Sequence, residues 1–445
     1  MTRLFACFLA LGLALASCLT ATRASAQDTT KGIDNVRVIL EYQPGVRPGL
    51  VVLPGTSTLD SARAIVRRDL DYSDRFQIVE VGDPGTGPAG RGGAEGGGIS
   101  YGIYKALGAQ FGVELSDAAG GVAVRLHDVA AGKVQNQQTF ALPPLTDPNY
   151  RMEVHRIADE VARWASGTLG IAASRILFVS GGRVYLVDSD GEAITPLTAA
   201  GQTALSPVWS PDGQRFAYTV LAGGRGGIMV QTLGSGAAAQ VPGTNTGLNI
   251  TPAFSPDGRL LAYAHSDETG TDVFLANIAD RCCAQRLTVG RYADNLSPTF
   301  SPDGRRIAFV STRAGPPQVY VMAADGTDQE LLAPFDYGAT GSSNAPEWSP
   351  DGANVVFHRE VSGSPQLFLV DVAGRRVRQL TSSGRNEDPT WAPDGRHITF
   401  VSDRSGARQL WVIDVESGRV RQLRTPGAAR LPAWSRRLSR TAVAP

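Results

Sequence analysis

Short apolar strands separated by polar turns recur along the second half of the chain. The phrase aromatic-Ser-Pro-Asp-Gly begins at Trp209, Phe254, Phe300 and Trp348, it reads Trp-Ala-Pro-Asp-Gly from Trp391, and a sixth copy stops after Trp434-Ser435. The spacings from one aromatic to the next are 45, 46, 48, 43 and 43 residues. Periods in this range are typical of propeller blades of about four strands each. The pattern therefore predicts an all-β six-bladed propeller.

Each repeat contains the signals for four strands. Ser-Pro-Asp-Gly turns the chain after the aromatic, because proline presets one backbone dihedral and glycine accepts the left-handed conformation that follows. Runs such as Leu260–Tyr263 and Ile307–Val310 are apolar at successive positions, which indicates strands covered on both faces. A third strand such as Gln318–Met322 and a short fourth complete the blade. The turn aspartates are predicted to be structural, since their spacing follows the blades.

The two ends of the repeat array predict how the ring closes. Residues 175 to 198 contain signals for three strands of a blade that lacks a first strand. Pro432-Ala-Trp434 resembles a first strand without the rest of its blade. We predict that these segments pair, which would leave no sheet edge free to pair with another chain. We also predict that the aromatic of every repeat is buried.

The first half of the mature chain has mixed helix and strand signals. We predict a small α/β domain over residues 27–168, followed by the propeller over residues 169–445. The helix after Asp147-Pro148 has a carboxylate near its cap and proline at its start, and it should end near Gly167. The elements expected in this domain are strands at 36–40, 50–53 and 76–81, a helix after 58–60, a short helix at 99–107, a hairpin at 122–140 and the long helix after 148.

A glycine-rich insert occupies residues 82–98, of which nine are glycines. Gly85–Gly90 matches the glycine spacing of a dinucleotide-binding loop. Such a loop needs a helix to open at its third glycine, and the glycine-rich residues that follow are poor helix formers. We therefore predict no nucleotide and no other cofactor.

The N-terminus predicts export from the cytoplasm. An apolar run follows Arg3, and Ala24-Ser-Ala26 fits a cleavage site, so residues 1–26 read as a signal peptide and the mature protein as periplasmic. Leu15–Cys18 also fits the box before a lipidated cysteine, and this alternative stays open. The adjacent Cys282 and Cys283 could form a vicinal disulfide or lie in a surface turn without a redox role. No later stretch reaches the roughly 20 apolar residues of a membrane span.

Charge and motifs argue against nucleic acid and against an active site. Lys plus Arg equals Asp plus Glu at 42 each, so nothing in the balance indicates a nucleic-acid partner. The five histidines show no metal-binding pairing, and no Gly-x-Ser-x-Gly elbow is present. Asp188-Ser-Asp-Gly191 looks like a calcium loop but lacks further ligands. His155 is expected to lie on the polar side of its helix. These observations predict no metal and no catalytic residue.

The order of these parts resembles one family. The helix phrase His155–Asp159 precedes Ser166–Gly170, then come Arg175–Ser180 and the repeats that end in Pro432–Ser435. With the signal peptide and the small α/β domain, this order resembles the TolB family, periplasmic proteins of the Tol-Pal system with a propeller of WD40-like repeats.

The resemblance implies a function and two binding sites. It implies a non-enzymatic, monomeric adaptor that binds the lipoprotein Pal and the inner-membrane protein TolA, maintains outer-membrane integrity and supports envelope constriction in cell division. The residues that would meet Pal at one propeller mouth are Leu248, Asn249, Thr251, Asp294, Asn295, Leu296, Asn344, Asn386, Glu387 and Asp388. The segment that would bind TolA comprises Val36, Arg37, Val38, Ile39 and Leu40, which suits pairing with a sheet edge.

Other interpretations stay open beside the resemblance. Loops rich in Asn, Asp and Ser on a rigid ring suit a protein partner, but they are also ordinary solvated turns. A secreted propeller hydrolase or lyase acting at the central channel is the alternative function, and an ion or small ligand in that channel would favour it. A lipid-anchored lectin is a third hypothesis. The glycine-rich insert departs from the family pattern and has no assigned role.

Overall fold

The computed structural model describes residues 47–81, 99–279, 284–290, 292–335 and 341–439. All of these described residues belong to one compact unit. The predicted signal peptide, the strand at 36–40, the glycine-rich insert and the two adjacent cysteines lie outside the described residues. None of the described helices combines the length and the apolar character needed to cross a membrane.

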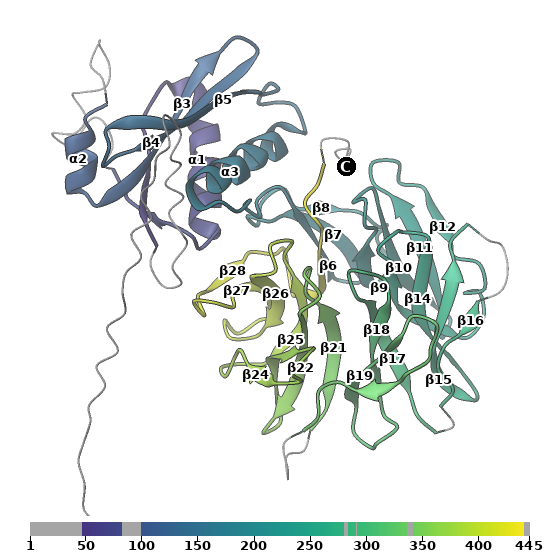
Figure 1. Cartoon of the computed structure of the whole chain (residues 1–445). Coiled ribbons are helices and arrows are strands. Elements are labelled where there is room, and N and C mark those ends of the chain that lie inside the picture. The colour runs from purple at the N-terminus through teal and green to yellow at the C-terminus, as the bar shows by residue number, and fades with distance from the viewer. Residues whose placement is uncertain (1–46, 82–98, 280–283, 291, 336–340, 440–445) are drawn as a thin grey trace, which may run out of the picture. The chain divides into compact units, whose positions relative to one another are not determined.

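A five-stranded sheet occupies the first part of the described chain (Figure 1). Its strands are β1 (Gly49–Val52), β2 (Gln77–Ile78), β3 (Ala109–Ala118), β4 (Gly121–Asp128) and β5 (Lys133–Ala141), in the order β2-β1-β3-β4-β5. β1 runs parallel to both of its neighbours, whereas β3, β4 and β5 form antiparallel pairs. β3 was not predicted from the sequence, although its apolar residues alternate as in a half-buried strand.

Two long helices provide the apolar surface that covers this sheet. They are α1 (Asp60–Tyr72), which follows a 3₁₀ turn at Ser57–Leu59, and α3 (Tyr150–Ser166), while α2 (Tyr101–Ala106) is short. α3 ends as predicted at Gly167, whose φ of 79° is readily reached only by glycine. Val66 and Leu70 of α1 share one buried cluster with Ile157 and Val161 of α3 and with apolar residues of β3 and β4.

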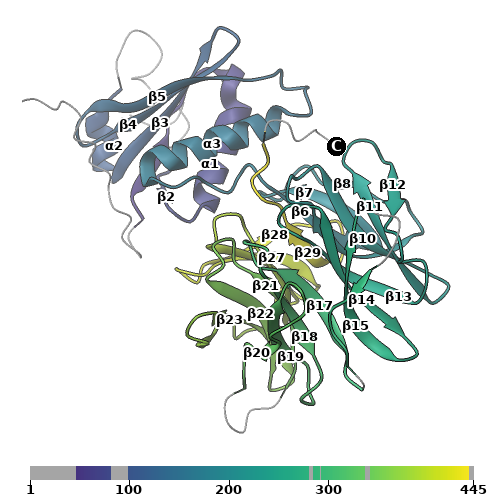
Figure 2. The ribbon, with the colours of Figure 1, turned by 45° about the vertical axis from the view of Figure 1, so that its right-hand side comes forward.

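The remaining strands form the propeller (Figures 1 and 2). Four of its sheets have four strands each, and an eight-stranded sheet contains two further runs of four that meet through the pairing of Gly226 with Leu248. The strands are β6 (Arg175–Ser180), β7 (Arg183–Asp188), β8 (Thr195–Pro196), β9 (Thr203–Trp209), β10 (Arg215–Ala222), β11 (Arg225–Thr232), β12 (Ala238–Gln240), β13 (Leu248–Phe254), β14 (Leu260–Asp267), β15 (Gly270–Asn277), β16 (Gln285–Arg286), β17 (Asn295–Phe300), β18 (Arg306–Ser311), β19 (Gln318–Ala323), β20 (Glu330–Leu331), β21 (Ser343–Trp348), β22 (Asn354–Val361), β23 (Ser364–Asp371), β24 (Val377–Gln379), β25 (Asn386–Trp391), β26 (His397–Ser402), β27 (Gln409–Asp414), β28 (Val420–Leu423) and β29 (Arg430–Trp434).

The last strand closes the ring as predicted. β29 pairs antiparallel with β6, so that one sheet has the order β29-β6-β7-β8. Trp434 lies opposite Ile176, and its indole Nε1 donates a hydrogen bond of 2.7 Å to the Ser174 hydroxyl. The two ends of the repeat array therefore share one sheet.

The repeat aromatics are buried, which confirms that prediction, and the turns after them explain why the phrase recurs. In four repeats the serine hydroxyl donates to the turn aspartate, which also accepts the backbone N–H two residues later. These aspartates are structural, as predicted. The buried aromatics are Trp209, Phe254, Phe300, Trp348, Trp391 and Trp434.

Candidate functional site: the central channel of the propeller

A cavity of about 960 Å³ is lined by the first strands of the repeats, β9, β13, β17, β21, β25 and β29. Each of these strands has proline two positions before its aromatic, and each ladder shifts register close to that proline. The wall therefore bulges at an equivalent place in every repeat. These bulges give the channel its lining.

The residue before each of these prolines has a left-handed backbone conformation. None of the six is glycine, and φ lies between 47° and 53°. Such residues cost about 1–2 kcal/mol each and concentrate at functional sites. This feature was not predicted from the sequence, because a residue before proline ordinarily favours extended backbone. The residues are Ser206, Thr251, Ser297, Ala345, Asp388 and Leu431, and all of them line the cavity.

Three of the predicted mouth residues are structural, which corrects the sequence analysis. Asn249, Asn295 and Asn386 are each 0% exposed. The Asn386 side chain donates to Gln366 Oε1 at 2.8 Å and accepts from the Arg404 guanidinium at 2.7 Å. Asn295 and Asn249 make comparable buried hydrogen bonds, so that each of the three side chains donates to a residue of the preceding repeat and contacts a residue of its own repeat through Oδ1. A buried amide that connects strands in this way is not free to contact a partner.

The other predicted mouth residues divide into two groups. Thr251, Leu296, Asn344 and Asp388 line the cavity. Leu248, Asp294 and Glu387 do not line it: Asp294 is exposed, Leu248 is half-buried, and Glu387 is paired with Arg385 and Arg408. The predicted TolA segment, Val36, Arg37, Val38, Ile39 and Leu40, lies outside the described residues.

Two carboxyl groups and an imidazole share one sector of the channel wall. Glu347 of β21 and Asp388 of β25 belong to first strands that contact each other, and His358 lies opposite Asn344 on β22. The backbone N–H of Asp388 donates to His358 Nδ1 at 3.2 Å, which requires the tautomer with its proton on Nε2. Burial lowers the pKa of His358, although the Asp388 carboxylate opposes this shift, so the ring is neutral.

Glu347 has a strongly shifted pKa. Burial raises the pKa of its carboxyl to about 8, against hydrogen bonds from the Thr390 hydroxyl and the Trp391 backbone N–H. Burial also raises the pKa of Asp388, while His358 opposes the shift. Strongly perturbed groups in a cavity wall are candidates for a functional site. The sequence analysis did not single out Glu347, although it is the only carboxyl between proline and aromatic in the six first strands.

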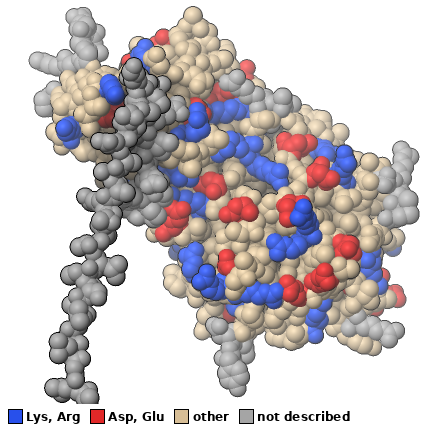
Figure 3. All heavy atoms as spheres, viewed as in Figure 1, with Lys and Arg blue, Asp and Glu red and all other residues tan. Residues whose placement is uncertain are grey.

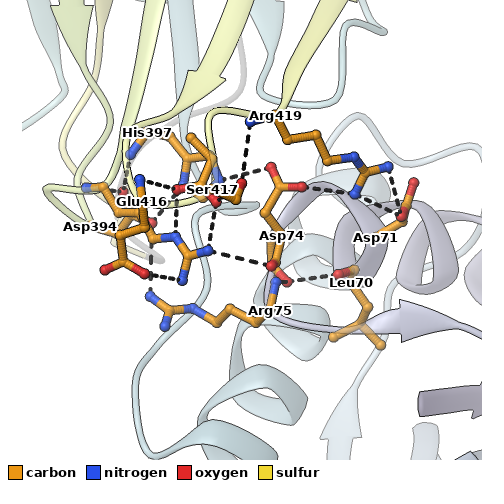
Figure 4. Close-up of polar contacts among 12 residues, drawn as sticks. Leu70, Asp71, Asp74, Arg75, Asp394, His397, Glu416, Ser417 and Arg419 are labelled. Carbon is orange, nitrogen blue, oxygen red and sulfur yellow. Dashed lines mark hydrogen bonds and ion pairs between the residues drawn. The ribbon is translucent and has the colours of Figure 1, made fainter. Parts of the chain in front are cut away.

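A second polar cluster connects the turn after α1 to the sheet β25–β28 (Figure 4). His397 contacts Asp394 Oδ2 through Nδ1 at 2.8 Å and Asp74 Oδ2 through Nε2 at 3.2 Å. Burial alone would lower the pKa of His397, but the two carboxylates outweigh it and raise the pKa to about 9. The ring is therefore charged near neutral pH. Arg419 contacts the other oxygen of Asp74 at 2.8 Å.

A comparable arrangement surrounds His155 of α3. This residue is 0% exposed, so the prediction that it lies on a polar face was wrong. Its ring lies 2.7 Å from Asp69 of α1 and 3.5 Å from Asp188 at the end of β7. Burial opposes protonation, yet the carboxylates raise the pKa of His155 to about 10. A buried cation between two carboxylates fixes α1 and α3 to this turn of the propeller.

The chemistry of these two clusters does not suit a metal ion, although each brings two aspartates and a histidine together. Asp188 is paired with Arg151 and Arg175, and Asp190 with Arg68 and Arg151. Asp414 is paired with Arg396 at 2.6 Å. Carboxylates already neutralised by guanidinium groups, beside a protonated histidine, are poor metal ligands. The Asp188–Gly191 turn is therefore a site of ion pairs.

Comparisons with known proteins address the family and the fold. The family model of the TolB β-propeller domain matches residues 166–337 and 332–443. The Tol-Pal system protein TolB of Alcanivorax borkumensis is 30% identical over 220 residues, which are 46% of this chain and 49% of that protein. The match thus spans about half the length of this curated relative.

Solved structures extend the likeness in fold beyond the propeller. TolB from Acinetobacter baumannii superposes with a TM-score of 0.74 at 22% identity, covering 88% of this chain and 98% of that one. The Kuenenia stuttgartiensis hydrazine synthase matches with a TM-score of 0.50 at 16% identity, over 61% of this chain and 48% of that chain. The second protein is an enzyme by its name, so the propeller fold alone does not decide the function.

Proposed function

The chain belongs to the TolB β-propeller family, and from this premise we propose that it is a non-enzymatic periplasmic adaptor of the Tol-Pal system. In this proposal it is a monomer. It binds Pal at the channel mouth and TolA through residues 36–40, and it thereby maintains outer-membrane integrity and supports constriction in cell division.

The observation that carries this proposal is the channel itself. Six non-glycine residues hold left-handed conformations around a cavity of about 960 Å³. Strain retained at equivalent places around one cavity supports a binding role for that cavity. A rigid ring also lowers the ordering cost of binding a protein partner.

We also propose that the ring has six blades. In this count the eight-stranded sheet contributes two blades, β9–β12 and β13–β16, and the sheet closed by β29 is the sixth. The division into residues 27–168 and 169–445 belongs to the same proposal.

A capture experiment tests the function. The mature protein, immobilised and exposed to detergent-solubilised envelope extract, is expected to retain Pal and TolA, identified by mass spectrometry. Removal of residues 27–40 should abolish the recovery of TolA and leave that of Pal unchanged. Recovery of neither protein by the intact mature chain would contradict the adaptor function.

A bulky substitution in the cavity tests the Pal site. Leu296 is half-buried and lines the channel, so Leu296→Trp should obstruct it and weaken Pal binding at least tenfold in a titration calorimeter. Val134→Trp is the matched control, because Val134 lies on β5 at 40% exposure and does not line the cavity. Equal Pal affinities for the two variants would place the binding site elsewhere.

The ionisable groups of the channel favour one second candidate, a secreted hydrolase or lyase. Glu347 and the neutral His358 could act as acid and base on a substrate held in the cavity. Turnover of an oligosaccharide or peptide substrate by the mature protein, lost in His358→Gln, would support this alternative. We expect no turnover.

A further inference from the structure

The channel wall has an uneven distribution of charge. At the position between proline and aromatic, the six first strands have Val208, Ala253, Thr299, Glu347, Thr390 and Ala433. At the left-handed position, only Asp388 of the six is charged. Both carboxyl groups thus come from the neighbouring strands β21 and β25. The rest of these two rings of residues is apolar or carries hydroxyl groups, which gives the channel one acidic side.

Neither carboxyl group has a cationic partner among the ion pairs of the described residues. Glu347 accepts hydrogen bonds only from a hydroxyl and a backbone N–H, and Asp388 accepts one from the backbone N–H of Leu431 at 3.3 Å. Glu387, the sequence neighbour of Asp388, shows the contrast, because it is paired with two arginines. Both residues are half-buried in the cavity wall, and a carboxyl group partly removed from water without a counter-ion is unfavourable unless it takes up a proton or a cation.

The charged groups nearby do not supply that cation. His358 is neutral, because its Nδ1 accepts the N–H of Asp388. Arg385 and Arg408, which affect this region electrostatically, are both paired with Glu387. Arg436 and Arg437 also line the cavity. Arg437 contacts Asp159 of α3 and the carbonyl oxygen of Gly170, and the exposed Arg436 forms no ion pair with Glu347 or Asp388. The acidic side of the channel therefore has an unfilled preference for positive charge.

An extended cation suits this wall better than a metal ion. Groups of three ligand atoms within 4.8 Å of one another occur at two places in the described part of the chain, and neither is in the channel. A guanidinium or ammonium group on a flexible stem can instead reach separated carboxyl groups with several donors. The His358 Nε2–H can in addition donate to an acceptor next to that cation.

We infer that the acidic side of the channel, formed by Glu347 and Asp388 beside His358, receives a lysine or arginine side chain of the protein partner. This inference rests on the proposed function, because it names the chemistry by which the channel recognises that partner. The positive charge of this side chain favours loss of the proton that Glu347 holds near neutral pH. It also offsets the unfavourable free energy of partly burying the two carboxyl groups.

The test compares Pal affinities of the mature protein and three variants in a titration calorimeter. Glu347→Gln and Asp388→Asn keep size and hydrogen bonding but remove the charge, and each should weaken binding at least tenfold. Glu330→Gln is the control, because Glu330 is exposed on β20 and outside the cavity. For the wild type, affinity should rise from pH 6 to pH 8 as Glu347 loses its proton more easily. Wild-type affinity in both channel variants would overturn the inference while leaving the adaptor function intact.

The weaker Pal binding expected of Glu347→Gln can be distinguished from a loss of folded protein. The folded state raises the pKa of Glu347 from 4.5 to about 8, so the native chain holds a proton that the unfolded chain releases, and stability falls as pH rises through this window. Glu347→Gln should therefore unfold at a higher urea concentration than the wild type at pH 7 and at a similar one at pH 4. A variant that is more stable and yet binds more weakly identifies a binding residue.

A coupling experiment locates the partner's cation. Each lysine and arginine of Pal is replaced by alanine in turn, and one replacement should weaken binding to the wild type tenfold but have little further effect on Glu347→Gln. Additive effects at every position would contradict the inference.

A small probe decides the case in which the wild type does not bind Pal. Butylguanidinium should then shift the indole N–H resonances of Trp348 and Trp391, which flank this wall, in the wild type and not in Glu347→Gln. No shift in the wild type would overturn the inference, and a shift would retain the cation site although the adaptor proposal had failed.

Discussion

The buried asparagines show how residue type can mislead at the scale of single residues. Asparagine in a loop at a propeller mouth suggests a partner contact, yet the buried amides of Asn249, Asn295 and Asn386 each donate to the preceding repeat and so connect neighbouring repeats. A sequence pattern does not report whether an amide faces solvent or a neighbouring strand. The sequence contains one regularity that accompanies these buried asparagines. Arg313 and Arg404, whose guanidinium groups donate to Asn295 and Asn386, each follow their asparagine by 18 residues.

Replacing Asn386 should therefore affect folding rather than recognition. Asn386→Leu removes a buried acceptor of the Arg404 guanidinium and the donor to Gln366, and it should lower the free energy of unfolding by about 3 kcal/mol. Urea denaturation measures this change. Asp294→Asn, at an exposed position of the same mouth, should stay within about 0.5 kcal/mol. An Asn386→Leu protein of unchanged stability would contradict this account.

Deprotonation of His397 should lower the stability of the protein at alkaline pH. The folded state raises the pKa of His397 from 6.5 to about 9, so its contribution is complete below pH 6.5 and disappears as pH rises through 9. The difference between these pKa values corresponds to on the order of 3 kcal/mol. Urea denaturation at pH 6.5, 8 and 9.5 should show this decline in the wild type.

His397→Gln provides the comparison, because glutamine can hydrogen-bond but cannot take the charge between Asp74 and Asp394. Its unfolding free energy should be lower at pH 6.5 and should change less between pH 6.5 and 9.5. His155, with a pKa raised to about 10, adds a decline of its own in both proteins. Parallel curves for the two proteins would show that His397 is not charged in the folded state.

At the scale of elements, the repeats could be predicted more reliably than the sheet that precedes them. Because the phrase occurs five times, it marks the turn that follows the first strand of each repeat. The short strand around Trp434 was recognisable as an incomplete copy of the same phrase. β3 has no repeat to identify it, so it was missed although it is central to its sheet. β2 has only two residues, which is less than the apolar pattern suggested.

The closing strand β29 should be essential for propeller stability. Trp434 is buried and joins β29 to the sheet of β6, so Trp434→Ala should cost about 3–5 kcal/mol of unfolding free energy. Trp434→Phe keeps an aromatic side chain but loses the hydrogen bond to Ser174, which should cost about 1 kcal/mol of unfolding free energy. Removal of residues 431–445 should lower the melting temperature sharply in scanning calorimetry. An unchanged melting temperature would mean that β29 does not secure the ring.

At the scale of the whole molecule, the sequence predicted the scaffold better than the site. Blade period and domain order follow from local patterns, whereas the acidic side of the channel depends on which wall positions of neighbouring strands face the same cavity. Glu347 and His358 lie on the paired strands β21 and β22 of one sheet, whereas Asp388 comes from β25 of the next sheet and joins them only through the ring. The equal numbers of acidic and basic residues in the chain do not indicate that one side of the channel is acidic. Figure 3 likewise shows acidic and basic side chains intermixed on the surface it displays.

The pairing of the last strand with β6 has a consequence for the biogenesis of the protein. The sheet begun by β6, β7 and β8 is completed only by residues that are synthesised roughly 230 positions later, since loop closure must precede the contacts that reward it. A chain shortened by stalled translation or by proteolysis of its end would leave β6 without its β29 partner. We therefore expect the ring to close only in chains that reach β29, and shorter fragments to be more open to proteases.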